Sequence, residues 1–202
     1  MTFEECIKRC AATAHEEDGG PDSIHTKLIP GLVQFVNGML KPNSTILDVG
    51  CGPAHASIMF KQLGHKPTAT SIMPAEVNAA RQKGIDAVLQ EMHAPIQGKY
   101  DLIWMRHIAE HSPCPFLLLR NMYEAANDGG LLYLEVPQPW TANLHEANPN
   151  HWSMLSPLAW AALLVRAGWA IIHEQTIQLL TGMGPDFYQM IVCKKEPPKQ
   201  QP

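Results

Sequence analysis

The chain alternates between segments with two kinds of hydrophobic periodicity. Short runs of β-branched and other apolar residues are typical of buried strands, whereas apolar residues that recur every three or four positions are typical of amphipathic helices. The predicted strands are residues 45–49, 67–72, 86–90, 100–106, 131–136, 169–175 and 187–194. The predicted helices are residues 3–15, 24–39, 54–63, 74–83, 114–126 and 157–167. This alternation predicts an α/β fold with one mostly parallel, seven-stranded sheet and helices on both faces.

Two segments depart from the regular pattern. In helix 24–39 we expect a kink or an interruption at Pro30, because proline removes a backbone donor and clashes with the preceding turn. The expected apolar face of this helix consists of Ile24, Leu28, Leu32, Phe35, Val36 and Leu40. Residues 137–155 contain proline, asparagine, histidine and tryptophan without a period, which predicts one long irregular segment.

Composition and charge narrow the class of protein. Apolar residues make up 46% of the 202 residues and charged residues 17%, as in globular proteins. The formal net charge of −4 gives no basic surface, so neither duplex nucleic acid nor an anionic membrane is expected as a partner. No apolar run approaches the roughly 20 residues that span a bilayer, and the N-terminus lacks the apolar core of a secretory signal. We therefore expect one cytoplasmic domain.

The cysteines do not indicate a disulfide framework. They stand at positions 6, 10, 51, 114 and 193, an odd number without framework spacing, which is typical of reduced thiols. Cys6 and Cys10 form C-x-x-x-C, but Thr13 stands where a cluster-binding radical enzyme would need a further cysteine. An iron–sulfur or zinc site at Cys6, Cys10 and His15 is therefore disfavoured against cysteines that pack within a helix.

The clearest candidate for a ligand site is I-L-D-V-G-C-G at residues 46–52. Two glycines directly after a buried strand allow a sharp turn into a helix and a close approach of a ligand to the backbone. In an open parallel sheet, ligands bind outside the carboxyl ends of the strands, which is where this turn lies. A dinucleotide fingerprint would need glycine in place of His55 and an acid in place of Ser71. The pattern favours another nucleotide-like ligand.

From about residue 44 to 194 the chain resembles the class I S-adenosylmethionine-dependent methyltransferases. Five segments in the family's order carry the resemblance: I-L-D-V-G-C-G-P-A, S-I-M-P-A-E-V-N-A-A-R, L-Q-E-M-H-A-P-I, Y-D-L-I-W-M-R-H-I-A-E-H-S-P-C-P-F and N-D-G-G-L-L-Y-L-E-V-P. The small-molecule and sugar methyltransferase-like branch is most similar, because it combines R-H-x-x-E-H and E-V-P with a late H-x-S-x-x-S/T-P, here residues 151–157. The resemblance implies a single Rossmann-like domain, the class I methyltransferase fold, with S-adenosylmethionine as the cofactor.

The resemblance also implies how this domain is divided. N-terminal helices would occupy residues 1–40, the cofactor-binding core 44–136, a substrate-covering segment 137–155, a C-terminal helix and strands 156–194, and a tail 195–202. The expected partner is a small-molecule acceptor, with oxygen or carbon of a sugar-like compound as the methylated atom. The sequence leaves the oligomeric state open.

The resemblance assigns roles at the cofactor site. Asp48 would reach toward the ammonium group, directly or through water, and the two glycines would let the backbone pass the methionine moiety. Glu91 would accept from the adenine amino group, while Ile72 and Met92 would cover the ring. Ser71 departs from the family's usual ribose-binding acid, so we expect weaker binding by about 1 to 3 kcal/mol unless another group substitutes. The expected cofactor-binding residues are Asp48, Gly50, Cys51, Gly52, Ser71, Ile72, Glu91, Met92, Arg106 and His107.

Two histidines are candidates for catalysis, His107 and His111. His107 follows a predicted strand and would lie beside the sulfonium as a base or positioning group, since imidazole accepts protons near neutral pH. The alternative is structural, with His107 and Glu110 satisfying backbone groups at the strand end. Residues 107–111 also spell the inverted zinc-peptidase motif H-x-x-E-H, but that motif has to lie on a helix, so no metal is expected.

The irregular segment supplies the candidates for acceptor binding, Trp140, His145, His151 and Trp152. They would form aromatic walls and imidazole contacts, or else belong to a surface loop that caps the core. Two other functions stay open: a non-catalytic module that keeps the fold and binds S-adenosylmethionine, and a protein or nucleic-acid methyltransferase. The second is disfavoured by the acidic balance and by the absence of an N/D-P-P-Y/F tetrapeptide after the fourth strand, where residues 106–109 read R-H-I-A.

Overall fold

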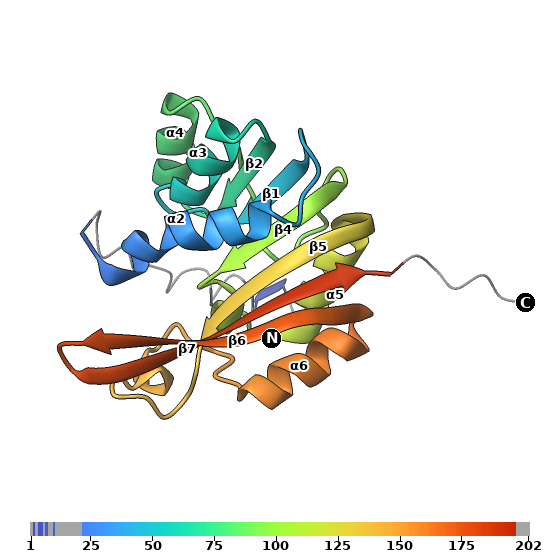
Figure 1. The fold of residues 1–202 in the computed structure, drawn as a ribbon. Coiled ribbons are helices and arrows are strands. Elements are labelled where there is room, and N and C mark those ends of the chain that lie inside the picture. The colour runs from blue at the N-terminus through green and yellow to red at the C-terminus, as the bar shows by residue number, and fades with distance from the viewer. Residues whose placement is uncertain (1, 3, 6, 8–9, 11–21, 197–202) are drawn as a thin grey trace, which may run out of the picture.

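A seven-stranded sheet forms the centre of the computed structural model, which describes residues 2, 4, 5, 7, 10 and 22–196 (Figure 1). The strand order is β3-β2-β1-β4-β5-β7-β6. Neighbouring strands are parallel from β3 to β5, whereas β7 is antiparallel to both β5 and β6. The strands are β1 (Thr45–Val49), β2 (Lys66–Ser71), β3 (Asp86–Leu89), β4 (Tyr100–Arg106), β5 (Ala126–Pro137), β6 (Trp169–Thr181) and β7 (Gly184–Lys195). The predicted fold class is confirmed.

Helices cover both faces of the sheet, because strands that are apolar on both sides must be buried on both sides. In Figure 1, α2, α3 and α4 lie on one face, and α5 and α6 lie on the other. Successive residues of β1 show the division, since Ile46 packs in the cluster of α2 and α3 and Leu47 in that of α5 and α6. The helices are α2 (Ile24–Asn37), α3 (His55–Gln62), α4 (Pro74–Gln82), α5 (Pro115–Ala125) and α6 (Pro157–Arg166), with 3-10 turns η1 (Ala109–His111) and η2 (His145–Ala147).

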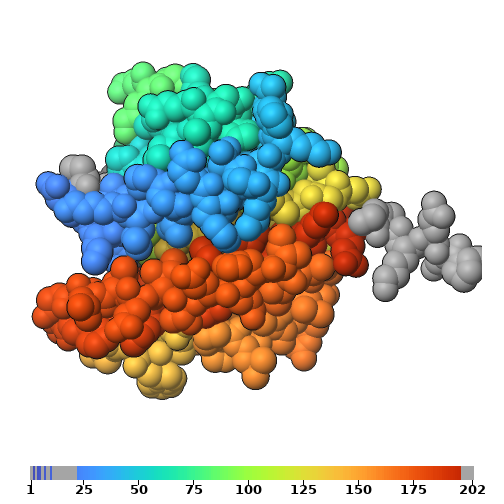
Figure 2. All heavy atoms as spheres, viewed as in Figure 1, coloured from blue at the N-terminus to red at the C-terminus, as the bar shows by residue number. Residues whose placement is uncertain are grey.

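Helix α2 differs from the prediction in two respects. It continues through Pro30 without interruption, because this proline lies exposed on the outer side while the inner side is held by packing. Its apolar face is also rotated, since Ile24 and Phe35 are 39% and 38% exposed. The buried residues of the helix are Ile29, Val33 and Val36. Figure 2 shows α2 beside the β6–β7 hairpin, where the Phe35 ring lies 5.0 Å from that of His173.

The last two strands are longer than the predicted segments 169–175 and 187–194. Tyr188 of β7 pairs with Pro137 at the end of β5. The residues of β7 before it, 184–187, pair with β6 only. This part of the hairpin projects from the sheet, and Leu180 and Met183 at its tip are each 74% exposed. Most residues of this part are exposed, and its buried positions include an acid, Asp186, beside Leu179, so the hydrophobic pattern does not reveal these strand residues. The irregular segment 137–155 lies alongside this part of the hairpin, where the Ala142 amide donates to the Pro185 carbonyl.

Strand β5 also begins earlier than predicted, at Ala126 instead of residue 131. Residues 127–130, which lie between the predicted helix 114–126 and the predicted strand 131–136, form an irregularity within the strand, and the register with β4 shifts between Tyr100 and Leu102. A Cβ atom on Gly130 would lie 2.8 Å from the Asn127 carbonyl oxygen, so the irregularity requires glycine there.

The two ends of the chain are described only in part. Residues 4, 5, 7 and 10 are helical, as predicted, while the rest of the predicted helix 3–15, including Cys6 and His15, lies outside the described residues. The tail beyond residue 196 lies outside them as well. Among the described helices, none has the length and apolar character needed to cross a membrane. Among the described cysteines, Cys51, Cys114 and Cys193 are free thiols.

Candidate functional site

A cavity of about 500 Å³ opens at the carboxyl ends of the parallel strands. Its centre lies between β1 and β4, where the strand order reverses, which is the usual ligand position in such sheets. The strand ends form one part of the lining, and α2, residues 137–155 and β7 form the other. We call these parts the cofactor end and the acceptor end.

The turn after β1 gives the cofactor end its shape. Gly50 and Gly52 have positive φ angles of 68° and 48°, and Ala54 at the start of α3 has one of 61°. A Cβ atom on Gly50 would lie 2.5 Å from Ile108 Cδ1, so the turn packs against the residue that follows His107. A Cβ atom on Gly52 would meet only Glu76 Oε1 at 4.0 Å. Gly50 is therefore required by packing within the protein, whereas Gly52 leaves space beside the cavity.

Asp48 is the buried acid of this turn. Its side chain lines the cavity, and its Oδ2 accepts a hydrogen bond of 2.6 Å from Ser57 Oγ on α3. Burial raises the pKa of Asp48 to about 6, although the hydrogen bonds from Ser57 oppose the shift. A positively charged group in the cavity would favour the ionised carboxylate.

The ends of β2 and β3 complete the cofactor end. Ser71, Ile72, Glu91 and Met92 all line the cavity, as the sequence predicts. The Glu91 carboxylate also holds the His93 side chain, with 2.7 Å between Oε1 and Nδ1, and accepts from the His93 amide at 2.9 Å. These bonds fix the carboxylate and leave it further lone pairs for a ligand.

His107 forms a pair with a buried carboxylate from the neighbouring strand. It directly follows β4, has a positive φ of 55°, and places Nε2 2.7 Å from Glu135 Oε1. Tyr133 donates its hydroxyl to the other Glu135 oxygen, and Arg106 Nε lies 2.9 Å from Oε1. A backbone conformation this rare for histidine persists only where the surroundings enforce it, and such strain gathers at functional sites.

The electrostatics of this pair leave a neutral imidazole beside an ionised acid. Burial opposes ionisation of Glu135, but hydrogen bonds from His107 and Tyr133 and the charge of Arg106 hold its pKa well below the ordinary value. Burial lowers the pKa of His107, although the bond to Glu135 opposes the shift. Nε2–H therefore donates to the carboxylate, and Nδ1 is the nitrogen that can accept a proton.

A second pair of histidine and acid stands at the acceptor end. His145 from η2 places Nε2 3.0 Å from Oδ1 of Asp186, a fully buried residue on the projecting part of β7. Tyr188 links the two pairs, because its hydroxyl donates to Asp186 at 2.9 Å and its ring stacks on His107 at 4.7 Å. The imidazole of His25 on α2 packs edge-on against both rings, and burial lowers its pKa to about 4.

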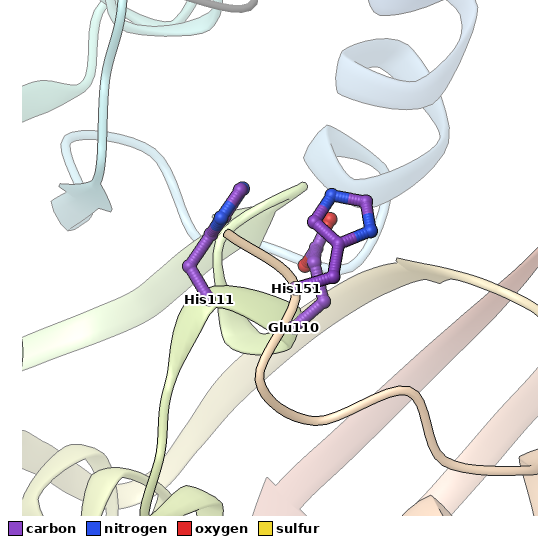
Figure 3. A group of neighbouring side chains, drawn as sticks. All are labelled: Glu110, His111 and His151. Atoms are coloured by element: carbon purple, nitrogen blue, oxygen red, sulfur yellow. The ribbon is translucent and has the colours of Figure 1, made fainter. Parts of the chain in front are cut away.

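Glu110, His111 and His151 form a third group, drawn in Figure 3. Each offers one possible ligand atom, and these atoms lie within 4.8 Å of one another. One carboxylate and two imidazoles are donors that a divalent transition metal accepts. Both nitrogens of His151 have partners within the protein, however, because Nδ1 lies 2.9 Å from the His145 carbonyl oxygen and Nε2 3.2 Å from Asn148 Nδ2. The expectation of no metal stays a prediction.

The structure brings nearly all predicted site residues to this one cavity. The exception is Trp140, which is not part of the lining, has a positive φ of 65° and is 85% exposed. Its backbone turns the ring toward solvent, so its position does not support a role as an acceptor wall. The predicted residues that line the cavity are Asp48, Gly50, Cys51, Gly52, Ser71, Ile72, Glu91, Met92, Arg106, His107, His111, His145, His151 and Trp152.

Several residues of the site were not predicted from the sequence. They are His25, Glu76, Glu135, Asp186 and Tyr188. Glu135 lies in the E-V-P segment of the resemblance, which was a usable signal. Glu76 likewise lies in the S-I-M-P-A-E-V-N-A-A-R segment of the resemblance, although the resemblance assigned it no role. The other three come from a helix face and a hairpin, where no local pattern marks them.

Comparison with known proteins identifies the family. A family model described as a methyltransferase domain matches residues 23–174. The chain belongs to this methyltransferase family. Among curated relatives, the ubiquinone biosynthesis O-methyltransferase of Xanthomonas axonopodis pv. citri (strain 306) is 28% identical over 129 residues, which are 59% of this chain and 54% of the relative. The methyltransferase thus spans about half the length of the curated relatives it matches.

Solved structures share the fold of this methyltransferase at low identity. N-methyltransferase NodS from Bradyrhizobium japonicum WM9, in complex with S-adenosylhomocysteine, gives a TM-score of 0.71 at 11% identity over 95% of this chain and 97% of that chain. The 1,6-didemethyltoxoflavin-N1-methyltransferase of Burkholderia thailandensis also gives 0.71, at 15% identity over 96% and 89%. Both structures contain S-adenosylhomocysteine, and at these identities they show that the chain has the class I methyltransferase fold. S-adenosylmethionine as the cofactor is the expectation from the sequence.

The residues of the cofactor end fit this cofactor. Gly52 leaves room for a ligand beside the first turn, and Asp48 offers a carboxylate to an ammonium group. Ile72 and Met92 offer apolar surface, and Glu91 offers acceptor oxygens to an amino group. The individual roles of these residues stay predictions.

Proposed function

We propose that this methyltransferase methylates a hydroxyl oxygen of a small, hydroxyl-rich acceptor, with His107 as the general base. The observation that carries the proposal is the His107–Glu135 pair, in which the buried Glu135 holds His107 and His107 lines the same cavity as the β1 turn. Ile108 links the two directly, since it follows His107 and packs against Gly50. A base is thereby held beside the place where the cofactor binds.

The cofactor supplies a methyl group activated by the sulfonium, so the chain has to provide alignment more than acid–base power. Asp48 holds the ammonium group, the glycine turn lies along the methionine moiety, and Ile72 and Met92 hold the adenine. Alignment of two reactants in one cavity contributes several kcal/mol to a rate.

His107 accepts the proton that the acceptor loses. Its Nε2–H is held by Glu135, so Nδ1 presents the lone pair, and the lowered pKa of His107 keeps that nitrogen unprotonated at neutral pH. Nδ1 would take the hydroxyl proton as the acceptor oxygen gains the methyl group and the bond between that methyl carbon and the sulfonium sulfur breaks, which leaves S-adenosylhomocysteine. The negative charge of Glu135 then stabilises the imidazolium that results.

The lining of the acceptor end supports a polar acceptor of the sugar-like kind expected from the sequence. Hydrogen-bonding side chains predominate there, and they are His25, Asn143, His145, Asn148, Asn150 and Tyr188. The names of the curated relatives, O-methyltransferases, support oxygen as the methylated atom. Methylation at carbon is the alternative and would use the same base.

Two experiments test the proposal. Isothermal titration should show S-adenosylhomocysteine binding, and labelled S-adenosylmethionine should label at least one compound in a panel of sugars, polyols and phenols. Absence of binding at millimolar ligand would overturn the proposal. Binding without turnover on any acceptor would favour a non-catalytic module, and labelling of protein or nucleic acid alone would favour a macromolecular methyltransferase.

A further inference from the structure

The end of β2 carries a hydroxyl where the resemblance implies an acid. Ser71 is 5% exposed, and its Oγ accepts a hydrogen bond of 2.9 Å from the Met73 amide. A hydroxyl has one hydrogen to donate, and that hydrogen points to Glu76 Oε2, 2.5 Å away. Ser71 therefore orients a carboxylate and has little capacity left to hold a ligand by itself.

Glu76 occupies the first turn of α4 and lines the cavity together with Ser71. The partial positive charge at the amino end of a helix stabilises a carboxylate in this position. Its second oxygen, Oε1, faces the β1 turn, because it would lie 4.0 Å from a Cβ atom on Gly52. Within residues 22–196, Oε1 forms no hydrogen bond, and Ser71 holds the other oxygen.

A carboxylate held in this way suits a pair of neighbouring hydroxyl groups. Each carboxylate oxygen accepts a hydrogen bond, and bonds to a charged acceptor are about twice as strong as those between neutral groups. We propose that Glu76 is the residue that binds the ribose diol of the cofactor, and that Ser71 positions it. The acid has moved from the strand end to the following helix, so the site keeps its charge although residue 71 is neutral. This inference rests on the proposed function, because it requires that the cofactor binds here.

The inference reverses the expectation that Ser71 weakens binding. It also changes what Ser71→Asp should do, since a second carboxylate would stand beside Glu76 and repel it. We expect Ser71→Asp alone to weaken S-adenosylhomocysteine binding. In the double variant with Glu76→Gln, where the repulsion is absent, the affinity should recover.

The test is isothermal titration with two probes, S-adenosylhomocysteine and its 2′-deoxyribose analogue. The affinity of wild type for S-adenosylhomocysteine should exceed that for the 2′-deoxyribose analogue by about 10- to 100-fold, the range for losing a charge-assisted hydrogen bond. Glu76→Gln should lose most of its affinity for the first probe and nearly all discrimination between the two. Asp86→Asn removes a carboxylate at the start of β3, outside the cavity lining, and should change neither value.

The outcomes separate this inference from the proposed function. Wild-type binding with unchanged affinity and discrimination in Glu76→Gln overturns the inference alone, whereas failure of wild type to bind either probe overturns both. The double variant Ser71→Asp/Glu76→Gln should regain at least part of the discrimination, with an unfolding midpoint close to that of wild type. Should it behave like Glu76→Gln, the diol is held by other residues and the inference is wrong.

Discussion

The two ends of the cavity are assembled in different ways. At the cofactor end, most lining residues lie at the ends of β1, β2 and β3 or directly after them, so each is fixed by its strand. At the acceptor end, α2, the segment 137–155 and the projecting part of β7 meet far from one another in sequence. There the partner of His145 is Asp186, 41 residues away, and the ring stacked on His107 is that of Tyr188.

This difference indicates which end is specialised. Parallel strands that end at one edge bring a nucleotide site together whatever the later segments are. The acceptor end depends on a loop and a hairpin tip, which can vary without disturbing the sheet. His107 belongs to both ends, because it follows β4 and stacks on Tyr188. Substitutions at the two ends should therefore have separable effects.

The largest expected effect is at the first turn. Gly52→Val should abolish S-adenosylhomocysteine binding at millimolar ligand while the protein still folds, because the side chain would fill the space beside the turn. Gly64→Val is the matched control, since Gly64 also has a positive φ, of 86°, with nothing within 4 Å of a Cβ atom. Titration of both variants measures the effect, and equal binding by Gly52→Val and wild type would show that the first turn does not hold the cofactor.

The next effect distinguishes the two histidine–acid pairs. His107→Ala should lower turnover by about 10² to 10⁴, the range for a general base, and leave cofactor affinity nearly intact. His107→Asn should behave in the same way, because asparagine tolerates the positive φ better than most residues. His145→Ala should mainly raise the apparent KM for the acceptor. Steady-state kinetics at saturating S-adenosylmethionine measure turnover and KM for the three variants. A loss of turnover in His145→Ala, with only a raised KM in His107→Ala, would make His145 the base.

The pattern of confirmed and missed elements follows the same division. Strands with core on both sides, such as β1 and β4, were predicted nearly to the residue, because burial imposes a continuous apolar run. The projecting part of the β6–β7 hairpin was missed because most of its residues are exposed and one of its few buried residues is an acid, Asp186. The expected interruption at Pro30 was wrong because packing outweighs one lost helix hydrogen bond. Sequence patterns therefore report burial more than hydrogen bonding.

The candidate site divides in the same manner. Asp48 and the two glycines were predicted from the motif at a strand end, and they line the cavity. Asp186 was not, since an isolated acid on a hairpin looks like any solvated charge. Glu76 was not either, although it lies in a segment of the resemblance, because the resemblance places the ribose-binding acid at residue 71. Trp140 shows the opposite error, because residue type alone does not determine the direction of a side chain.

A smaller effect should appear with pH at the cofactor end. Burial raises the pKa of Asp48 to about 6, so the ligand-free protein binds a proton there as the pH falls below that value. The neutral acid cannot pair with an ammonium group, and affinity for S-adenosylhomocysteine should fall by up to about tenfold per pH unit below about 6. Titrations between pH 7.5 and 5 measure the slope. Asp48→Asn should bind more weakly at neutral pH without this slope, and an identical slope in that variant would mean that another group titrates.

The smallest expected effect concerns the segment over the acceptor end. His151 lines the cavity, but both its nitrogens have partners within the segment, the His145 carbonyl and the Asn148 side-chain amide. We therefore expect it to act on the acceptor indirectly, by holding His145 in place. His151→Ala should raise the apparent KM for the acceptor by about three- to tenfold with turnover within about twofold, as expected when binding common to ground and transition states is removed. Trp140→Ala, in the same segment but 85% exposed, should leave both constants unchanged. A drop in turnover at unchanged KM in His151→Ala would instead place this histidine in the chemical step. If wild-type turnover were also lost on chelation, the group of Glu110, His111 and His151 would be assigned to a metal.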